Sequence, residues 1–354
     1  MSKFWNEVTN RLSPYVPGEQ TEAPGLIKLN TNENPYGPSP KVIQAISEAV
    51  GEDLRLYPDP QGLSLRAAIA ETVGLEKDNI FIGNGSDEVL AHTFRALFQT
   101  DKRILFPDVT YSFYPTYCKL FGLDFEQIKL NNEFEIQIED YDRECGGIIF
   151  PNPNAPTGID IGLGAIENLV KLKKDTIIVI DEAYIEFGAE TCAQLVRDHC
   201  NLLVTRSLSK SHSLAGLRVG YAIGDKELID GLYRVKDSFN SYPIDRLALR
   251  GAEEAVKDEV YLNQTNRRIC VSREKLFHEL KGLGFYVLPS KANFVFIKHE
   301  SFDGEELARK LRERNIIVRH FSKPNRIQDF IRVTVGTDAS VDVLVSVLRV
   351  ITSE

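Results

Sequence analysis

Three segments of the sequence carry residue types that can bind or transform a small ligand. They are Gly83–Glu88, Asp181–Tyr184, and Ser207–Lys210 with Arg218 a little further on. Paired glycines before a helix let backbone N–H groups approach an anion such as phosphate. An acid at the end of a strand lies where α/β sheets bind their ligands. A lysine beside a cation can act as a nucleophile toward a carbonyl group.

Each segment, taken alone, also fits a simpler interpretation or a different enzyme. The glycine segment is not a dinucleotide fingerprint, because Glu88 stands at the third glycine position. The apolar run before Asp181 matches a Walker B strand, but the chain has no G-x-x-x-x-G-K-[ST] loop. Ser207 and Lys210 form the S-x-x-K pair of β-lactamases, whose S-D-N and K-T-G partners are missing. A tight turn, a solvated strand end and an exposed lysine are the structural alternatives.

The three segments together supply what one cofactor requires. Pyridoxal phosphate needs a lysine for its aldehyde, an acid facing its pyridine nitrogen, a donor to its phenolic oxygen and a cup for its phosphate. Each requirement is met in this sequence, in order by Lys210, by Asp181, by Tyr184, and by the turn Gly85, Ser86 and Asp87 with Ser207 and Arg218. This joint occurrence predicts a pyridoxal-phosphate site without a metal ion.

Short apolar strands alternate with helices in the part of the chain that carries these segments. Strands are predicted at 79–82, 103–106, 147–150, 177–180, 202–205 and 220–223, with helices at about 40–50 and 63–73. This alternation indicates an α/β fold with a largely parallel sheet covered on both faces. After about residue 255, strands at 285–288, 293–297, 316–318 and 330–335 mix with helices at 304–314 and 339–351, which indicates a smaller α+β domain. The expected division is an arm over 1–40, a large domain over 41–255 and a small domain over 256–354.

Composition limits the partners that this chain can have. The 354 residues hold 42 Lys and Arg against 51 Asp and Glu, a net charge of −9, and the pI is near 5.4. Nucleic acid and anionic membranes both require a basic face, so neither is expected as a partner. The 5 cysteines are scattered and the 6 histidines have no ligand spacing, which argues against a disulfide framework or a zinc cluster. With no apolar leader segment, we expect a cytoplasmic protein.

The sequence resembles the fold-type-I pyridoxal-phosphate aminotransferases, and among them the histidinol-phosphate aminotransferases of class II. The resemblance spans nearly the whole chain and implies a large domain with a mostly parallel seven-stranded sheet between helices, plus the smaller α+β domain. Its motifs are Leu12–Tyr15, Leu29–Gly37, Tyr57–Asp59, Gly85–Glu88, Thr110–Tyr111, Asn152–Gly158, Asp181–Tyr184, Ser207–Arg218 and Arg332–Gly336.

The resemblance also implies a role for each residue around the cofactor. Lys210 would form the Schiff base and move the proton, Asp181 would keep the pyridine nitrogen protonated, and Tyr184 would hydrogen-bond the phenolic oxygen. Tyr111 would stack on the ring. The phosphate site would consist of Gly85, Ser86, Asp87, Ser207, Ser209 and Arg218, with Tyr57 reaching it from a partner subunit of a homodimer.

One position departs from the family pattern. Many relatives carry Asn before Pro-Thr-Gly, where it contacts the phenolic oxygen, whereas this chain has Ala155. Either Asn154 compensates or Tyr184 does that work with less help. Asn154 is therefore included among the expected cofactor residues.

Substrate recognition is expected to depend on arginine. A site that accepts both glutamate and a phosphorylated amine must bind two different anions, and the planar guanidinium group suits both carboxylate and phosphate. By the resemblance, Arg332 would bind the α-carboxylate of glutamate and contribute to the phosphate site. Arg319 and Tyr15 would help with the phosphate, and Asn34 would lie near the substrate.

The expected reaction is a ping-pong transamination. L-Histidinol phosphate and 2-oxoglutarate would give imidazole acetol phosphate and L-glutamate, reversibly, in histidine biosynthesis. Two enzymes of the same superfamily remain alternatives, an aromatic-amino-acid aminotransferase and a decarboxylase of the phosphothreonine type. A non-catalytic cofactor-binding domain is the alternative from another class.

Overall fold

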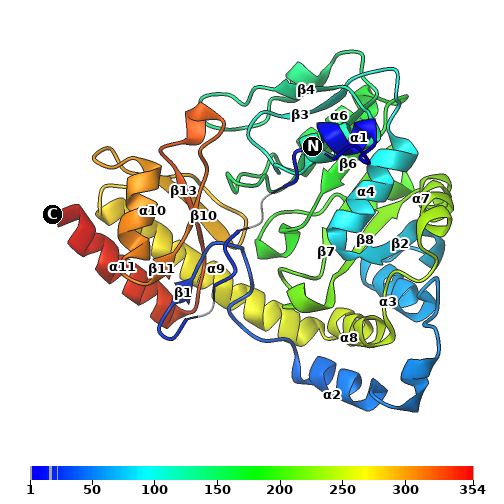
Figure 1. Cartoon of the computed structure of the whole chain (residues 1–354), viewed down its shortest axis with the longest axis horizontal. Coiled ribbons are helices and arrows are strands. Elements are labelled where there is room, and N and C mark those ends of the chain that lie inside the picture. The colour runs from blue at the N-terminus through cyan, green and yellow to red at the C-terminus, as the bar shows by residue number, and fades with distance from the viewer. Residues whose placement is uncertain (1, 16–17, 22, 354) are drawn as a thin grey trace.

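A seven-stranded sheet with strand order β2-β8-β7-β6-β5-β3-β4 forms the centre of the larger part of the molecule (Figure 1). The computed structural model describes residues 2–15, 18–21 and 23–353. The strand β8 runs antiparallel to both neighbours, and the remaining pairs are parallel. The mostly parallel sheet predicted from the sequence is therefore confirmed. Its strands are β2 (Ile80–Asn84), β3 (Ile104–Pro107), β4 (Phe125–Ile128), β5 (Gly147–Pro151), β6 (Ile178–Asp181), β7 (Leu202–Ser207) and β8 (Val219–Gly224).

Both faces of this sheet are buried under helices, because side chains alternate between the faces along each strand. In β6, Ile178 and Ile180 join one apolar cluster, while Val179 between them joins the other. The first cluster includes residues of α3, α6 and α8, and the second includes residues of α4, α5 and α7. The helices are α1 (Glu7–Arg11), α2 (Pro40–Ala49), α3 (Leu63–Val73), α4 (Gly85–Leu97), α5 (Tyr114–Phe121), α6 (Leu163–Leu172), α7 (Lys226–Phe239), α8 (Arg246–Lys257), α9 (Glu259–Gly282), α10 (Gly304–Arg312) and α11 (Asp338–Ser353).

A smaller antiparallel sheet, with strand order β12-β13-β10-β9, forms the second part of the molecule. It has its own apolar cluster, to which α9, α10 and α11 contribute. The two-residue strand β1 of the N-terminal arm pairs in parallel with β11, so the arm is attached to this smaller part. These strands are β1 (Ile27–Lys28), β9 (Tyr286–Val287), β10 (Phe294–Lys298), β11 (Ile316–Ile317), β12 (Arg319–His320) and β13 (Ile331–Thr334).

The sequence pattern missed three strands, β1, β4 and β12. Two of them have only two residues each, which is too short to show a period. In β4, Glu126 and Gln127 interrupt the apolar run at an edge of the sheet. By contrast, the helix predicted at 63–73 has those bounds in the structure. None of the helices in the described ranges is long and apolar enough to cross a membrane.

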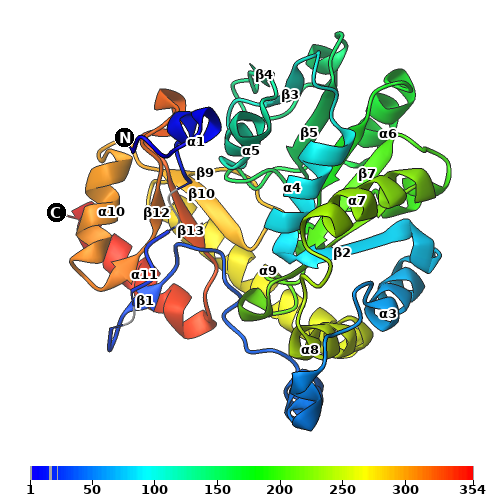
Figure 2. The same ribbon diagram turned by 45° about the vertical axis from the view of Figure 1, so that its right-hand side comes forward.

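The N-terminal arm passes between the two sheets before it reaches α2 (Figure 2). Asn32 of this arm contacts Tyr184 beyond β6 and Thr334 at the end of β13. The arm therefore lines the space between the carboxyl ends of the large sheet and the small sheet, where ligands of open α/β sheets bind.

Candidate active site

A cavity of about 440 Å³ lies where the two sheets and the arm meet. Its wall brings together residues from all three segments singled out in the sequence, together with both arginines expected to bind substrate. Twelve of the sixteen expected site residues line it, namely Tyr15, Ser86, Asp87, Tyr111, Asp181, Tyr184, Ser207, Ser209, Lys210, Arg218, Arg319 and Arg332.

Lys210 lies just beyond the end of β7, and its side chain lines this cavity. Its Nζ donates a hydrogen bond to the backbone oxygen of Thr31, at 3.1 Å. Burial disfavours the ammonium ion and the Arg332 cation repels it, and together they lower the pKa of Lys210 to about 8. Near neutral pH the neutral amine, which is the form that attacks a carbonyl carbon, is therefore more populated than in an exposed lysine.

Asp181 is the last residue of β6 and is almost completely buried. Its Oδ2 accepts a hydrogen bond from the Tyr114 hydroxyl at 3.2 Å, and its Oδ1 accepts one from the Ala183 N–H at 3.2 Å. Burial raises the pKa of Asp181 to about 6 in spite of these bonds. A carboxylate in this environment favours a cationic partner, such as a protonated ring nitrogen.

Tyr184 lies three residues beyond Asp181, and its ring packs edge-on against Phe294 of β10, at 5.1 Å between centroids. Its hydroxyl oxygen accepts a hydrogen bond from Asn32 Nδ2 at 3.0 Å. Burial raises the pKa of Tyr184, so the phenol keeps its proton at neutral pH. The side chain can therefore donate that proton in a hydrogen bond to a ligand in the cavity.

Several groups that can bind an anion meet at the start of α4, directly after β2. Gly85 adopts φ +80°, and a Cβ there would lie 2.4 Å from Arg218 Nη2, so a side chain at this position would displace the guanidinium group. Arg218 itself adopts φ +54° and pairs with Asp87 Oδ2 at 2.9 Å. Ser86 at the helix start, Ser207 at the end of β7 and Ser209 just beyond it also line the cavity. This arrangement of N–H, hydroxyl and guanidinium donors matches a phosphate group.

Tyr111 is connected to the same site through Asp87. The Tyr111 hydroxyl donates a hydrogen bond to Asp87 Oδ1 at 2.9 Å, and its ring lies edge-on to Tyr114, at 5.5 Å between centroids. Burial and the Asp87 carboxylate both raise the pKa of Tyr111. Its aromatic face is part of the cavity wall, where a planar ligand can stack.

Two arginines of the small sheet face the cavity from neighbouring strands. Arg319 of β12 and Arg332 of β13 are partners in the antiparallel register. Arg332 Nη2 donates to the Asn30 backbone oxygen at 3.0 Å, whereas its Nε is buried and has no hydrogen-bond partner among the described residues. A buried donor of this kind is costly unless a ligand satisfies it, and a carboxylate or phosphate has the matching geometry.

The four remaining expected residues lie beside the cavity or outside it. Gly85 supports Arg218 as described, and Asn34 Nδ2 donates to the backbone oxygens of Lys210 and Ser211 at 3.0 and 3.2 Å. Asn154 Nδ2 donates to the Val109 backbone oxygen and to Thr157. Tyr57 is 79% exposed and stacks on Tyr242 away from the cavity.

Sequence reasoning missed two side chains that position the expected ones. Asn32 contacts the Tyr184 hydroxyl and Tyr114 contacts the Asp181 carboxylate. Asn32 belongs to the motif Leu29–Gly37 that carried the family resemblance. The motif marked this segment as part of the family pattern, but it did not predict a contact between Asn32 and Tyr184. Tyr114 lies within α5 in an aromatic run, where a buried tyrosine is expected on packing grounds alone.

Comparisons with known proteins agree with this geometry. The family model for aminotransferases of class I and II matches residues 24–348. The chain belongs to this family. Curated members similar to it include histidinol-phosphate aminotransferase 1 of Bordetella parapertussis, 55% identical with all of both chains covered, and the histidinol-phosphate aminotransferase of Gluconacetobacter diazotrophicus, 56% identical with 99% of this chain and 98% of the relative covered.

Solved structures share the aminotransferase fold. The histidinol-phosphate aminotransferase from Clostridium acetobutylicum superimposes with a TM-score of 0.85, at 26% identity, over 93% of this chain and 99% of that chain. The enzyme from Sinorhizobium meliloti, solved in complex with pyridoxal-5'-phosphate, superimposes with a TM-score of 0.88, at 22% identity, over 100% and 98%. The family and the fold class predicted from the sequence are therefore confirmed.

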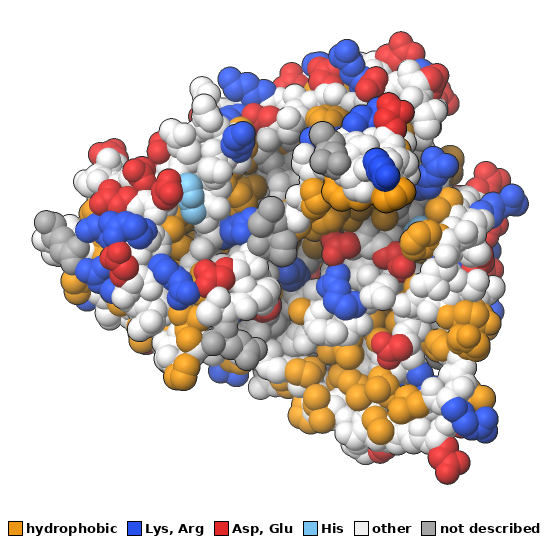
Figure 3. All heavy atoms as spheres, viewed as in Figure 1, with side chains coloured by type: hydrophobic (Ala, Val, Ile, Leu, Met, Phe, Trp, Pro, Cys, Tyr) orange, Lys and Arg blue, Asp and Glu red, His pale blue; other side chains and the backbone are white. Residues whose placement is uncertain are grey.

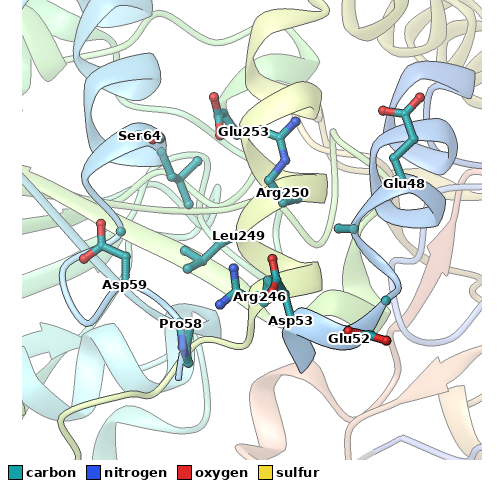
Figure 4. Close-up of a pocket in the computed structure, with 14 residues that line it drawn as sticks. Glu48, Glu52, Asp53, Pro58, Asp59, Ser64, Arg246, Leu249, Arg250 and Glu253 are labelled. Carbon is teal, nitrogen blue, oxygen red and sulfur yellow. Dashed lines mark hydrogen bonds and ion pairs between the residues drawn. The ribbon is translucent and has the colours of Figure 1, made fainter. Parts of the chain in front are cut away.

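A second cavity, of about 640 Å³, lies between helices α2, α3 and α8, and Lys210 is not among the residues that line it. Arg246, Leu249, Arg250 and Glu253 line it along α8, opposite Glu48 of α2 (Figure 4). Arg250 and Glu253 of this cavity already pair with each other within α8, at 3.0 Å. It contains none of the nucleophile, acid and phosphate-site residues found in the aminotransferase cavity.

Proposed function

We propose that this aminotransferase moves the amino group of L-histidinol phosphate to 2-oxoglutarate, giving imidazole acetol phosphate and L-glutamate in histidine biosynthesis. The observation that carries the proposal is one cavity in which Lys210, Asp181 and Tyr184 face Arg319 and Arg332. Full-length relatives at about 55% identity that carry this activity in their names support the choice of substrate.

The residues present fit pyridoxal phosphate. The turn at Gly85 leaves room for Arg218, and the Asn84 side chain does not cap α4, so the N–H groups at the start of this helix can donate to an anion. When bound, the cofactor supplies the electron sink that makes the α-proton of an amino compound acidic. Asp181 would keep a proton on the ring nitrogen, and the Tyr184 hydroxyl would donate a hydrogen bond to the phenolic oxygen. Tyr111 would stack on the ring.

Lys210 performs the proton transfer. Its amine, with a pKa of about 8, lies close enough to neutrality to accept the α-proton of the substrate and return it elsewhere. The Thr31 backbone oxygen accepts from the same amine and holds it between the cofactor site and Arg332.

Arg332 and Arg319 recognise the two anionic substrates in turn. Arg332 has a buried Nε that no described residue hydrogen-bonds, and it binds a carboxylate of glutamate or contributes to the phosphate site for histidinol phosphate. Arg319, its neighbour across the strand pair, adds to the phosphate site. Tyr15, whose ring packs on Phe113 at 5.0 Å, closes the same side of the cavity.

Three amine donors offered to the purified holoenzyme test this assignment. We expect histidinol phosphate to bleach the visible absorbance of the bound cofactor at a lower concentration than phenylalanine or tyrosine. A preference for phenylalanine would identify an aromatic aminotransferase instead. Carbon dioxide release from O-phosphothreonine without 2-oxoglutarate would identify a decarboxylase, and a cofactor spectrum that no donor changes would identify a binding domain.

The proposed enzyme is a homodimer with a shared active site. Large apolar side chains are exposed along the segment between α2 and α3, at Leu54, Leu56 and Tyr57. Hydrophobic side chains gather on the corresponding part of the surface, at the lower right of Figure 3. Such a patch is typical of a subunit interface. Tyr57 would extend from it to the cofactor phosphate of the partner subunit.

The division into domains supports this assignment of roles. We retain an arm over 1–40, a large domain over 41–255 and a small domain over 256–354. Helix α8 packs against α2 and ends at Lys257, while α9 begins at Glu259 and packs against α11. The cofactor residues then belong to the large domain and the substrate arginines to the small one.

A further inference from the structure

Asn32 is held in one orientation between the two sheets. Its exposed fraction is 1%, and its backbone adopts φ +56°, a conformation that Asn tolerates better than most residues. The backbone N–H of Asn32 donates to Thr334 Oγ1 at 3.0 Å, and its backbone oxygen accepts from Asn293 Nδ2 at 3.0 Å. The small sheet therefore fixes both backbone polar groups of this residue.

The same contacts fix which way the amide side chain points. The Thr334 hydroxyl, which accepts from the Asn32 backbone, donates to Asn32 Oδ1 at 3.1 Å. With its oxygen bound to Thr334, the amide presents its NH₂ group to the Tyr184 hydroxyl, 3.0 Å away. An NH₂ group can only donate, so the tyrosine oxygen must accept.

The direction of this hydrogen bond decides where the Tyr184 hydroxyl proton points. Because the Tyr184 oxygen accepts from Asn32, its own O–H bond is directed away from the amide. Tyr184 lines the cavity, as do Asn32 and Ala155, and the alanine side chain offers no competing polar atom. The Tyr184 proton is then available to a ligand oxygen in the cavity.

We propose that Asn32 is a positioning residue that directs the hydroxyl proton of Tyr184 toward the phenolic oxygen of the cofactor. This inference rests on the proposed function, because it assumes pyridoxal phosphate in the cavity. Thr334 takes part in the same chain of hydrogen bonds. It orients the amide, and it lies two residues from Arg332 on β13, so the strand that binds substrate also sets the donor on the cofactor side.

The test is a pair of variants measured in two backgrounds. Asn32→Leu removes the amide, and Thr334→Val removes the hydroxyl that orients it with little change of shape. Each is made in the natural chain and in Tyr184→Phe. The readouts are the pH midpoint of the visible absorbance of the holoenzyme, and the thermal unfolding midpoint.

We expect Asn32→Leu to raise the absorbance midpoint by about one pH unit and Thr334→Val to raise it by less, because a directed donor stabilises negative charge on the phenolic oxygen. In the Tyr184→Phe background neither variant should shift the midpoint further. If Asn32 only attached the N-terminal arm to the small sheet, its replacement would lower the thermal unfolding midpoint equally in both backgrounds. It would leave the absorbance midpoint unchanged.

The possible outcomes separate this inference from the proposed function. A natural chain that shows no visible cofactor band would overturn the proposed function. A normal band whose midpoint neither variant shifts, or shifts equally with Phe at position 184, would overturn the role of Asn32 alone. If Asn32→Leu does not fold, Thr334→Val decides by the same criterion.

Discussion

Single residues in the cavity owe their properties to neighbours that are far away in the sequence. Lys210 would be an ordinary ammonium ion in water, but burial and Arg332 lower its pKa to about 8. Asp181 is shifted the other way, because burial raises the pKa of its carboxyl group to about 6. The two shifts bring the pKa values of the amine and the carboxyl group closer to neutrality than they would be in water, as is common for groups in functional sites.

The lysine shift predicts a pH dependence for cofactor loading. Only the neutral amine attacks the aldehyde, and the pKa is lowered, so the loading rate of the apoenzyme should rise with pH and level off above about 8. Arg332→Leu removes a repelling cation and should move this midpoint upward. Stopped-flow absorbance on either side of that pH measures it. Arg349→Leu, at an exposed position on α11, is the matched control and should leave the midpoint in place.

Arg319 and Arg332 are expected to differ in which substrate they serve. Arg319→Gln should lower kcat/KM for histidinol phosphate about 10- to 100-fold, the usual cost of one charge-assisted hydrogen bond, while glutamate changes much less. Arg332→Gln should impair both substrates. Steady-state kinetics with each donor measures the ratio. Equal losses for both donors with Arg319→Gln would contradict a phosphate role, and Arg309→Gln on α10 is the control.

At the scale of secondary structure, the site residues lie at the ends of strands and at the start of a helix. Asp181 is the last residue of β6, Ser207 the last of β7, and α4 begins at Gly85 directly after β2. Parallel strands end at one edge of the sheet, so residues more than 90 positions apart in the sequence meet there. The small sheet contributes Arg319 and Arg332 because β12 and β13 pair in register.

Helix α2 offers a test at this scale. Ser39 caps it by accepting from the Lys41 N–H and also hydrogen-bonds the buried Asp258 at the start of α9. Ser39→Ala should lower the free energy of unfolding by about 1–2 kcal/mol, since a cap and a buried partner are both lost. Urea unfolding measures it. Ser47→Ala, at an exposed position of the same helix, should change it by less than about 0.5 kcal/mol.

At the scale of the whole molecule, a shared active site predicts complementation between inactive subunits. If Tyr57 reaches the partner's site as proposed, Lys210→Ala and Tyr57→Ala damage the same site from different subunits, and a mixed dimer contains one undamaged site. Refolding the two variants together should restore about a quarter of the natural activity, because half of the dimers are mixed and each has one working site. No recovery, with mixed dimers demonstrated by differently tagged subunits, would contradict the role of Tyr57.

The sequence by itself determined the chemistry and most of the architecture. The lysine, the acid, the tyrosine and the glycine turn were each readable from residue type and spacing, and β5 to β8 from apolar runs. These signals are local, since strand ends, caps and turns depend on neighbours in the chain.

Only the tertiary structure decided how the side chains between these groups are oriented. Asn154, next to Ala155, turns to the Val109 backbone, while Asn32, 152 residues away from Tyr184, donates to its hydroxyl. Likewise the lowered pKa of Lys210 depends on its burial between the two sheets and on the charge of Arg332 in the other sheet. Hydrogen bonds and charge interactions of this kind form between residues that packing brings together, and spacing along the chain does not encode their direction.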